Sequence, residues 1–291
     1  MILAFVARFP ISVRYMLLSA LGFALMAACV KAVSAYGIPV LEIVAARALV
    51  SLVISYFDIH RKKISVWGNN RLLLLARGVV GTLALICVFF AVTTLPLTEA
   101  TFLQYTYPAF TAVIALFFLK ERINLSTIVC ISLSLIGLMI IVQPGLSVGG
   151  VAALPLLSIV AALIGAFGSA VAYVLVRRLS QSEDSSVIIF YFPLIALPIS
   201  ILLLRDGFII PGLIESVLLI LVGIFTQIGQ VGITKAMSSD TAGKVAGYSY
   251  IQVVFAAVLG LVFFDELPSL WTMIGGCFIV AGAFINAMWK R

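Results

Sequence analysis

The chain has 291 residues, of which 64% are hydrophobic and only 10% are charged. Soluble domains carry about 25% charged residues, so this composition excludes an ordinary soluble protein. The net charge of +7 does not indicate nucleic-acid binding, because the basic residues cluster at the ends of apolar runs instead of forming a stripe along one surface. Such a distribution is typical of a protein embedded in a lipid bilayer.

About ten apolar runs follow one another along the chain, with short polar breaks between them. A helix that spans a bilayer needs roughly 20 apolar residues, so each run is predicted to be a transmembrane helix. The predicted spans, numbered 1 to 10, cover residues 14–35, 38–57, 72–93, 97–118, 125–143, 150–175, 187–204, 213–235, 242–264 and 270–288. They use nearly the whole chain, which predicts an all-α integral membrane protein without a soluble domain.

The basic residues predict the orientation of these spans. With the N-terminus in the cytoplasm, 14 of the 18 Lys and Arg residues fall on the inner side. They are Arg8, Arg14, Arg61, Lys62, Lys63, Arg71, Lys120, Arg122, Arg177, Arg178, Lys235, Lys244, Lys290 and Arg291. Cytoplasmic loops carry such an excess, so both termini are predicted to be cytoplasmic, in a bacterial inner membrane.

Span 2 carries Arg47 near its middle, too deep in the bilayer to reach the interface easily. A charge at this depth costs on the order of several kcal/mol unless it is paired or hydrated. We predict that Arg47 binds a carboxylate or phosphate group of a solute. The alternative is a buried structural ion pair, for which Glu42 and Glu99 are the nearest acidic candidates.

Three further charges lie in the first half of the chain. Glu42 and Glu99 lie near the outer ends of spans 2 and 4, where a buried carboxyl could carry protons. The alternative for both is an interfacial charge in contact with water. Arg77, about one turn inside the inner end of span 3, fits either a snorkelling anchor or a ligand.

Span 4 has a polar face around a proline. The residues Thr101, Gln104, Tyr105, Pro108 and Thr111 are spaced i, i+3, i+4, i+7 and i+10, and Tyr107 precedes the proline. Proline frees a backbone carbonyl, and helix breaks within a membrane are tolerated where they line a cavity. This face is therefore predicted to line a central cavity.

Polar faces recur in the second half. They comprise Ser169 and Tyr173 in span 6, Gln227, Gln230 and Thr234 in span 8, and Tyr248, Ser249 and Gln252 in span 9. Hydrogen bonds between helices use the same residue types and are the alternative. Together with Arg47, these faces suit an organic solute that has a flat or apolar part and an anionic group.

The two halves of the sequence repeat each other at an offset of 145 residues. The matches include Tyr105 with Tyr250, Phe110 with Phe255, Glu121 with Glu266, Thr127 with Thr272 and Gly137 with Gly282. Five spans is an odd number, so the halves, 1–145 and 146–291, are predicted to lie in opposite orientations. Inverted repeats are typical of secondary transporters.

Recognisable motifs stand in both halves. They are Thr98-Glu99-Ala100, Tyr107-Pro108, Phe118-Leu119-Lys120-Glu121-Arg122 and Gln143-Pro144-Gly145 in the first, and Phe264-Asp265-Glu266, Gly275-Gly276 and Gly282 in the second. These motifs resemble the EamA domain of the drug/metabolite transporter superfamily, and Arg47 resembles that family's arginine position. The resemblance implies ten helices in two inverted bundles and a central cavity lined by spans 1–4 and 6–9. It also implies that spans 5 and 10 lie at the periphery, where they often form a homodimer.

We predict a secondary active or facilitative transporter of small organic metabolites, such as amino acids, nucleotide-like or S-adenosylmethionine-like solutes, vitamins or drugs. A non-transporting scaffold or receptor is the main rival. An enzyme is disfavoured, because the single histidine, His60, lies in a basic loop and offers no catalytic set. The sequence lacks a Walker-type phosphate loop, and its four cysteines have no metal-like spacing, so neither ATP drive, a metal nor a cofactor is predicted.

Overall fold

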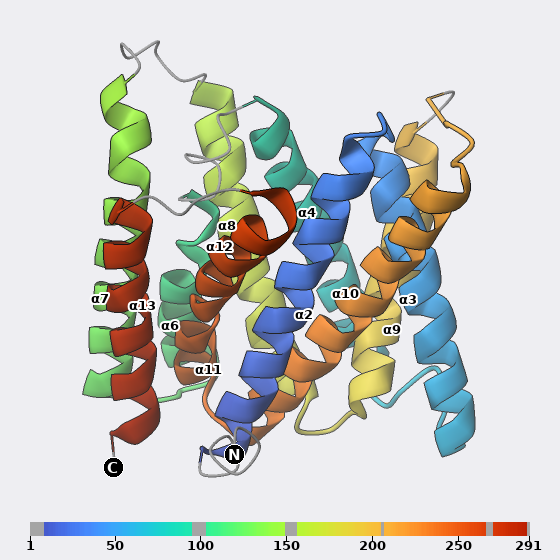
Figure 1. Ribbon diagram of the computed structural model, residues 1–291. Helices are drawn as coiled ribbons and strands as arrows, with labels where there is room; N and C mark the ends of the chain where they lie inside the picture. Colours follow the sequence, from blue (N-terminus) through green and yellow to red (C-terminus); the bar gives the residue numbers. More distant parts are fainter. Residues whose placement is uncertain (1–8, 95–102, 149–155, 205–206, 266–269, 290–291) are drawn as a thin grey trace.

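The computed structural model describes residues 9–94, 103–148, 156–204, 207–265 and 270–289, and all its regular elements are helices (Figure 1). The helices are α2 (Ile11–Ser34), α3 (Val40–Lys62), α4 (Arg71–Thr94), α6 (Tyr107–Phe118), α7 (Leu125–Val148), α8 (Leu156–Leu179), α9 (Ser185–Leu204), α10 (Leu213–Ser239), α11 (Ala242–Tyr248), α12 (Ile251–Phe264) and α13 (Leu270–Met288). Seven spans within the described residues are long and apolar enough to cross a membrane, with α11 and α12 together forming one of them. The shorter apolar stretches in α6, α7 and α13 complete the ten predicted spans.

The first described helix begins, and the last one ends, on the same side of the helical bundle. Helix α2 begins and α13 ends at this side, which we call the terminal face (Figure 1). Helix α8, the first helix of the second half, begins at the opposite face. The second five spans therefore run opposite to the first five, as the odd number of spans per half requires.

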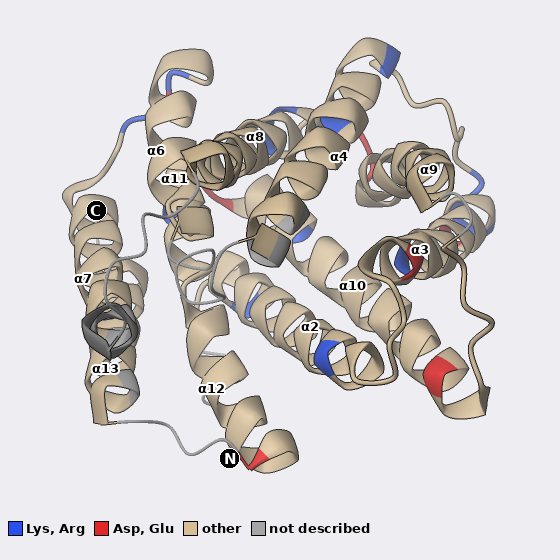
Figure 2. Ribbon diagram, turned by 90° about the horizontal axis from the view of Figure 1, so that it is seen from above, with Lys and Arg blue, Asp and Glu red and all other residues tan. Residues whose placement is uncertain are grey.

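Helix pairing respects the repeat, which relates α2 to α8, α3 to α9, α4 to α10, and α7 to α13. Helix α2 packs along α10, and its counterpart α8 packs along α4. The pairs α3 with α9 and α7 with α13 each join a helix to its own counterpart. Figure 2 shows α7 and α13 together at one edge of the bundle. The two halves thus interlock around a pseudo-twofold axis, with one helix pair at the periphery.

Spans 4 and 9 are not continuous helices. The break in span 4 lies next to Pro108, where the sequence indicated one, whereas the break in span 9 was not predicted. In span 9 a turn at Ser249 and Tyr250 separates α11 from α12, and in span 4 a turn at Tyr105 and Thr106 precedes α6. Pro108, in the first turn of α6, has no N–H to continue an earlier helix. Hydroxyl groups also compete with the helical hydrogen bonds, because Thr106 Oγ1 donates to Leu103 O and Ser249 Oγ to Ala246 O, both at 2.6 Å.

The contact between α2 and α10 depends on glycine. A Cβ atom on Gly22 would lie 2.8 Å from the backbone nitrogen of Gly229. At the same crossing, Ser19 Oγ donates to Gly229 O over 2.7 Å. The two backbones therefore approach more closely than side chains would permit, as small residues allow in membrane helices.

Candidate functional site

Two arginines contact one buried aromatic ring near the middle of the bundle. The guanidinium carbons of Arg47 on α3 and Arg77 on α4 lie 5.7 and 4.6 Å from the ring centre of Phe192 on α9. Arg77 and Phe192 are buried, and Arg47 is half-buried. An aromatic face attracts a cation by roughly 0.5–2 kcal/mol, which offsets only part of the cost of burying two charges.

The hydrogen bonds of Arg77 are incomplete. Its Nη2 donates to Gln230 Oε1 over 3.2 Å, while its Nε and Nη1 are buried without a partner. The ion pairs found in the described part of the chain include neither Arg77 nor Arg47. The interpretation of Arg77 as a snorkelling anchor is wrong, because its side chain is 4% exposed and points into the protein. Such donors can bind an anionic ligand.

A row of four tyrosines in ring contact begins beside the arginine pair. Tyr173 on α8 lies close enough to interact electrostatically with both arginines, and its ring centre is 5.2 Å from that of Tyr107. The Tyr105 ring lies 6.2 Å from Tyr107 and 6.0 Å from Tyr250. The hydroxyl group of Tyr250 is buried without a partner.

Tyr105 and Tyr250 also mark the two helix breaks. They match at the repeat offset and stack on one another, so the breaks in spans 4 and 9 meet. Paired discontinuous helices surround the substrate sites of many secondary transporters. The arginines, Phe192 and the tyrosines are therefore the strongest candidate for a solute site in the described structure.

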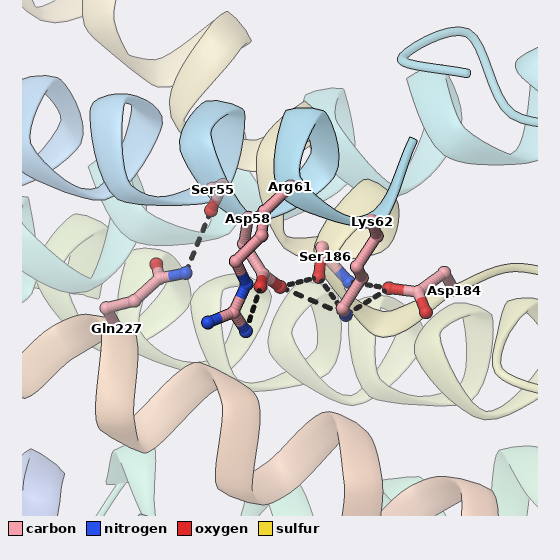
Figure 3. Close-up of polar contacts among 7 residues, drawn as sticks. All are labelled: Ser55, Asp58, Arg61, Lys62, Asp184, Ser186 and Gln227. Carbon is pink, nitrogen blue, oxygen red and sulfur yellow. Dashed lines mark hydrogen bonds and ion pairs between the residues drawn. The ribbon is translucent and has the colours of Figure 1, made fainter. Parts of the chain in front are cut away.

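The two glutamines of α10 contact the first half of the chain. Gln227 accepts a hydrogen bond from Ser51 Oγ at 2.5 Å, and its Nε2 donates to Ser55 Oγ at 2.9 Å, the latter drawn in Figure 3. Gln230, one turn away, accepts the bond from Arg77. Gln227 thus serves as an interhelical link, while Gln230 belongs to the arginine site.

The other predicted residues lie at various distances from this centre. Tyr248 donates to Asn286 O on α13 over 3.1 Å, which is a contact between helices. Gln104 Nε2 donates to Ser169 Oγ over 3.4 Å, and its Oε1 is buried without a partner. Pro108 is buried in the first turn of α6, and Gln252 is half-buried in the first turn of α12.

Of the two predicted proton carriers, Glu42 forms no ion pair with Arg47 among the described residues. Glu42 is 4% exposed and accepts a hydrogen bond from Ile209 N at 3.0 Å, in the segment between α9 and α10 at the opposite face. Glu99 lies outside the described residues. A role of either carboxyl in proton coupling stays a prediction.

Phe192, Ser51 and Ser55 were not predicted from the sequence as site residues. Nothing distinguishes Phe192 among the 20 phenylalanines of the chain. The two serines, in contrast, follow Arg47 at i+4 and i+8, so the polar face of span 2 could have been recognised from its spacing.

The known proteins with similar sequences include an exporter, a solute carrier and an uptake transporter. Pseudopaline exporter CntI of Pseudomonas aeruginosa is 31% identical over 275 residues, which cover 94% of this chain and 95% of that protein. Solute carrier family 35 member G1 of Mus musculus is 31% identical over 95% of this chain and 78% of its own. An S-adenosylmethionine uptake transporter of Rickettsia bellii is 25% identical over 64% of this chain.

A solved structure and a family match are consistent with these sequence relatives. A solved crystal structure superposes with a TM-score of 0.84 over 95% of this chain and 96% of the other, at 18% identity, which shows a shared fold. Residues 10–143 and 156–288 each match the EamA-like transporter family. The chain is therefore a multi-pass membrane protein that belongs to the EamA-like transporter family of the drug/metabolite transporter superfamily, whose members are transporters of small metabolites and not enzymes.

Proposed function

We propose that this transporter moves small organic metabolites that carry a carboxylate or phosphate group, and that Arg47 and Arg77 bind this group. The observation that carries the proposal is the placement of one buried and one half-buried cation, Arg77 and Arg47, on one aromatic ring without an acidic partner among the described residues. An anion between the arginines would satisfy the free donors of Arg77, while Phe192 and the tyrosines would contact a flat or apolar part of the solute.

The mechanism that fits this architecture is alternating access without ATP. Two inverted halves that pair symmetrically can exchange contacts at the two faces and expose a central site to one side at a time. The relatives are named an exporter in one case and an uptake transporter in another, so the family admits net flux in both directions. The boundary of the halves at residues 145 and 146 is supported by the separate family matches on either side of it.

We further propose that the terminal face is cytoplasmic. This proposal is supported by the 14 basic residues that the topology predicted from the sequence assigns to this side. A reporter enzyme that works only outside the cytoplasm, fused after Arg291, should be inactive. Activity of that fusion would show that the terminal face lies outside the cytoplasm.

A homodimer through α7 and α13 is a separate prediction, based on their position at one edge.

The substrate class can be tested with matched ligands. Purified protein would be screened by thermal shift against small carboxylates and their uncharged amides, since a ligand stabilises the state that it binds. We expect carboxylates to raise the melting temperature and the matching amides to have no effect. Equal shifts from both members of each pair would contradict an anion site.

Transport of the best ligand would then be measured in proteoliposomes. We expect Arg47→Gln and Arg77→Gln each to lower transport at least about tenfold, because a lost charged hydrogen bond costs roughly 1.5–3 kcal/mol. Arg178→Gln is the matched control, since Arg178 is exposed at the end of α8. Normal transport in both site variants would refute the site, and a complete lack of solute movement would favour a scaffold or receptor.

A further inference from the structure

A second polar space lies at the terminal face, away from the arginine pair. It is a cavity of about 470 Å³ between α3, α9 and α10. Its lining includes the basic residues Arg61, Lys62 and Lys235, the acidic residue Asp58, and Gln227. Cavities of 300–1,000 Å³ hold small organic ligands, so this one is large enough for a metabolite.

The charges around Lys62 compensate one another. Lys62 Nζ lies 3.0 Å from Asp58 and 2.9 Å from Asp184, and Ser186 Oγ bonds to Asp58 (Figure 3). Burial raises the pKa of the Asp184 carboxyl, but hydrogen bonds from Ser186 and Lys62 outweigh burial and hold this pKa below its ordinary value. The Asp184 carboxyl is therefore ionised near neutral pH. Asp58 and Asp184 both lie within ion-pair distance of Lys62 and compensate its charge.

The other two cations of the cavity, Arg61 and Lys235, are less fully compensated by acidic groups and can bind an anion. Arg61 Nη2 lies 3.2 Å from Asp58 Oδ1, so Asp58 pairs with Arg61 as well as with Lys62, and the Arg61 side chain is 82% exposed. The recorded contact of Lys235 is with the ring of Tyr15, 5.4 Å from Nζ, and no ion pair of Lys235 occurs in the described ranges. Three basic and two acidic groups give the cavity an excess positive charge, which attracts anions.

Two polar faces lead from this cavity toward the middle of the bundle. On α3, Ser51 and Ser55 occupy the positions between Arg47 and the cavity residue Asp58. On α10, Lys235, Val231 and Gln227 are spaced four residues apart and all line the cavity. Gln227 bonds to both serines, so an amide that lines the cavity is linked to the two hydroxyls that follow Arg47 along α3.

We propose that this cavity is an entry site for small organic anions on the terminal face, with Arg61 and Lys235 as the groups that bind the anion. The proposal rests on the proposed function, because it supplies the arginine pair with its ligand from this face. An anion held here would reach Arg47 when the hydrogen bonds of Gln227 to Ser51 and Ser55 open.

The test uses reagents of opposite charge and needs no knowledge of the substrate. A Val231→Cys variant would be treated, in sealed vesicles of either orientation, with sulfonatoethyl and trimethylammonioethyl methanethiosulfonate. Peptide mass spectrometry would separate residue 231 from the four native cysteines. We expect modification from the terminal face only, and faster modification by the anionic reagent.

Variants that remove the two cations test whether Arg61 and Lys235 attract the anion. Adding Arg61→Gln and Lys235→Gln should lower the ratio of anionic to cationic modification rates at least about threefold. Lys63→Asn is the matched control, because Lys63 is exposed, lies outside the cavity and has a positive φ of 54°, which Asn tolerates. An unchanged ratio in the double variant, or no modification from the terminal face, would overturn the proposal. If Val231→Cys does not fold, Phe57→Cys reports on the same cavity.

Anionic lipid headgroups share the chemistry of the proposed ligand, so a separate labelling experiment distinguishes the two. The labelling would be repeated in vesicles of neutral lipid and in vesicles that contain anionic lipid. We expect the same charge preference in both. Suppression of anionic labelling by anionic lipid would assign the cavity to a headgroup and overturn the entry site. Labelling does not require transport, so this outcome is independent of the result for Arg47 and Arg77.

Discussion

Arg77 combines deep burial with incomplete hydrogen bonding, a combination expected of a residue that binds a ligand and not of one with a purely structural role. A structural arginine is stabilised by a full set of partners, as Arg177 is by Glu121 Oε1 at 2.8 Å and Met237 O at 2.5 Å. Arg77 has Gln230 and the face of Phe192, and two of its nitrogens have no partner. The free protein therefore bears a cost at Arg77 that a bound anion would remove.

The residue-scale prediction compares these two arginines. Arg77→Leu should raise the stability of the ligand-free protein by about 1 kcal/mol or more, because a buried charge without an acidic partner is replaced by an apolar group. The same variant should lose anion-induced stabilisation. Arg177→Met should instead lower stability by about 2–3 kcal/mol, since it leaves the partly buried Glu121 without its ion pair. Thermal unfolding in detergent measures both, and a destabilised Arg77→Leu protein would indicate a structural role.

At the scale of helices, backbone proximity between α2 and α10 limits substitution. Gly22→Ala would place a Cβ atom 2.8 Å from Gly229 N and 3.0 Å from Phe225 O, and backbone atoms cannot rotate away. We expect a loss of about 1–3 kcal/mol of stability. Gly276→Ala on α13 is the control, because no atom lies within 4 Å of its added Cβ. That change should be neutral or stabilising by up to about 1 kcal/mol. Equal unfolding midpoints for the two variants would contradict the close crossing.

The helical elements also show what the sequence could and could not predict. Ten spans, their order and the inversion of the halves follow from hydrophobicity and an odd count, which are local or additive properties. The breaks at Tyr105 and Tyr250 were harder to predict. Pro108 indicates the first, but no proline accompanies the second, and the local bond from Ser249 Oγ to Ala246 O is of a kind that serine also makes within continuous helices.

The candidate site was predictable only in part, for a physical reason. Arg47 and the glutamines of α10 were found from charge and spacing. Phe192 was not, because its role depends on two arginines that come from different helices. Periodicity identifies the faces of a helix, but it does not say which faces meet.

At the scale of the whole molecule, the paired halves determine what alternating access requires of the site. Helix α2 contacts α10 as α8 contacts α4, and α12 contacts α2 as α6 contacts α8. Contacts formed at one face therefore have counterparts at the other, and the two end states can be close in free energy. In the proposed alternating-access mechanism, the central site would set the barrier between them, because it would be closed off from water on both sides during the transition.

This barrier should depend on whether the site is occupied. Closing an empty site would remove water from two cations that have no acidic partner in the described chain, whereas a bound anion would neutralise them. We expect exchange of labelled for unlabelled solute in proteoliposomes to be at least about tenfold faster than net efflux, which corresponds to 1.4 kcal/mol at the barrier. The neutral variant Arg77→Gln should narrow this gap as well as weaken binding. Equal rates of exchange and net efflux in the unmodified protein would show that the empty site reorients as freely as the loaded one.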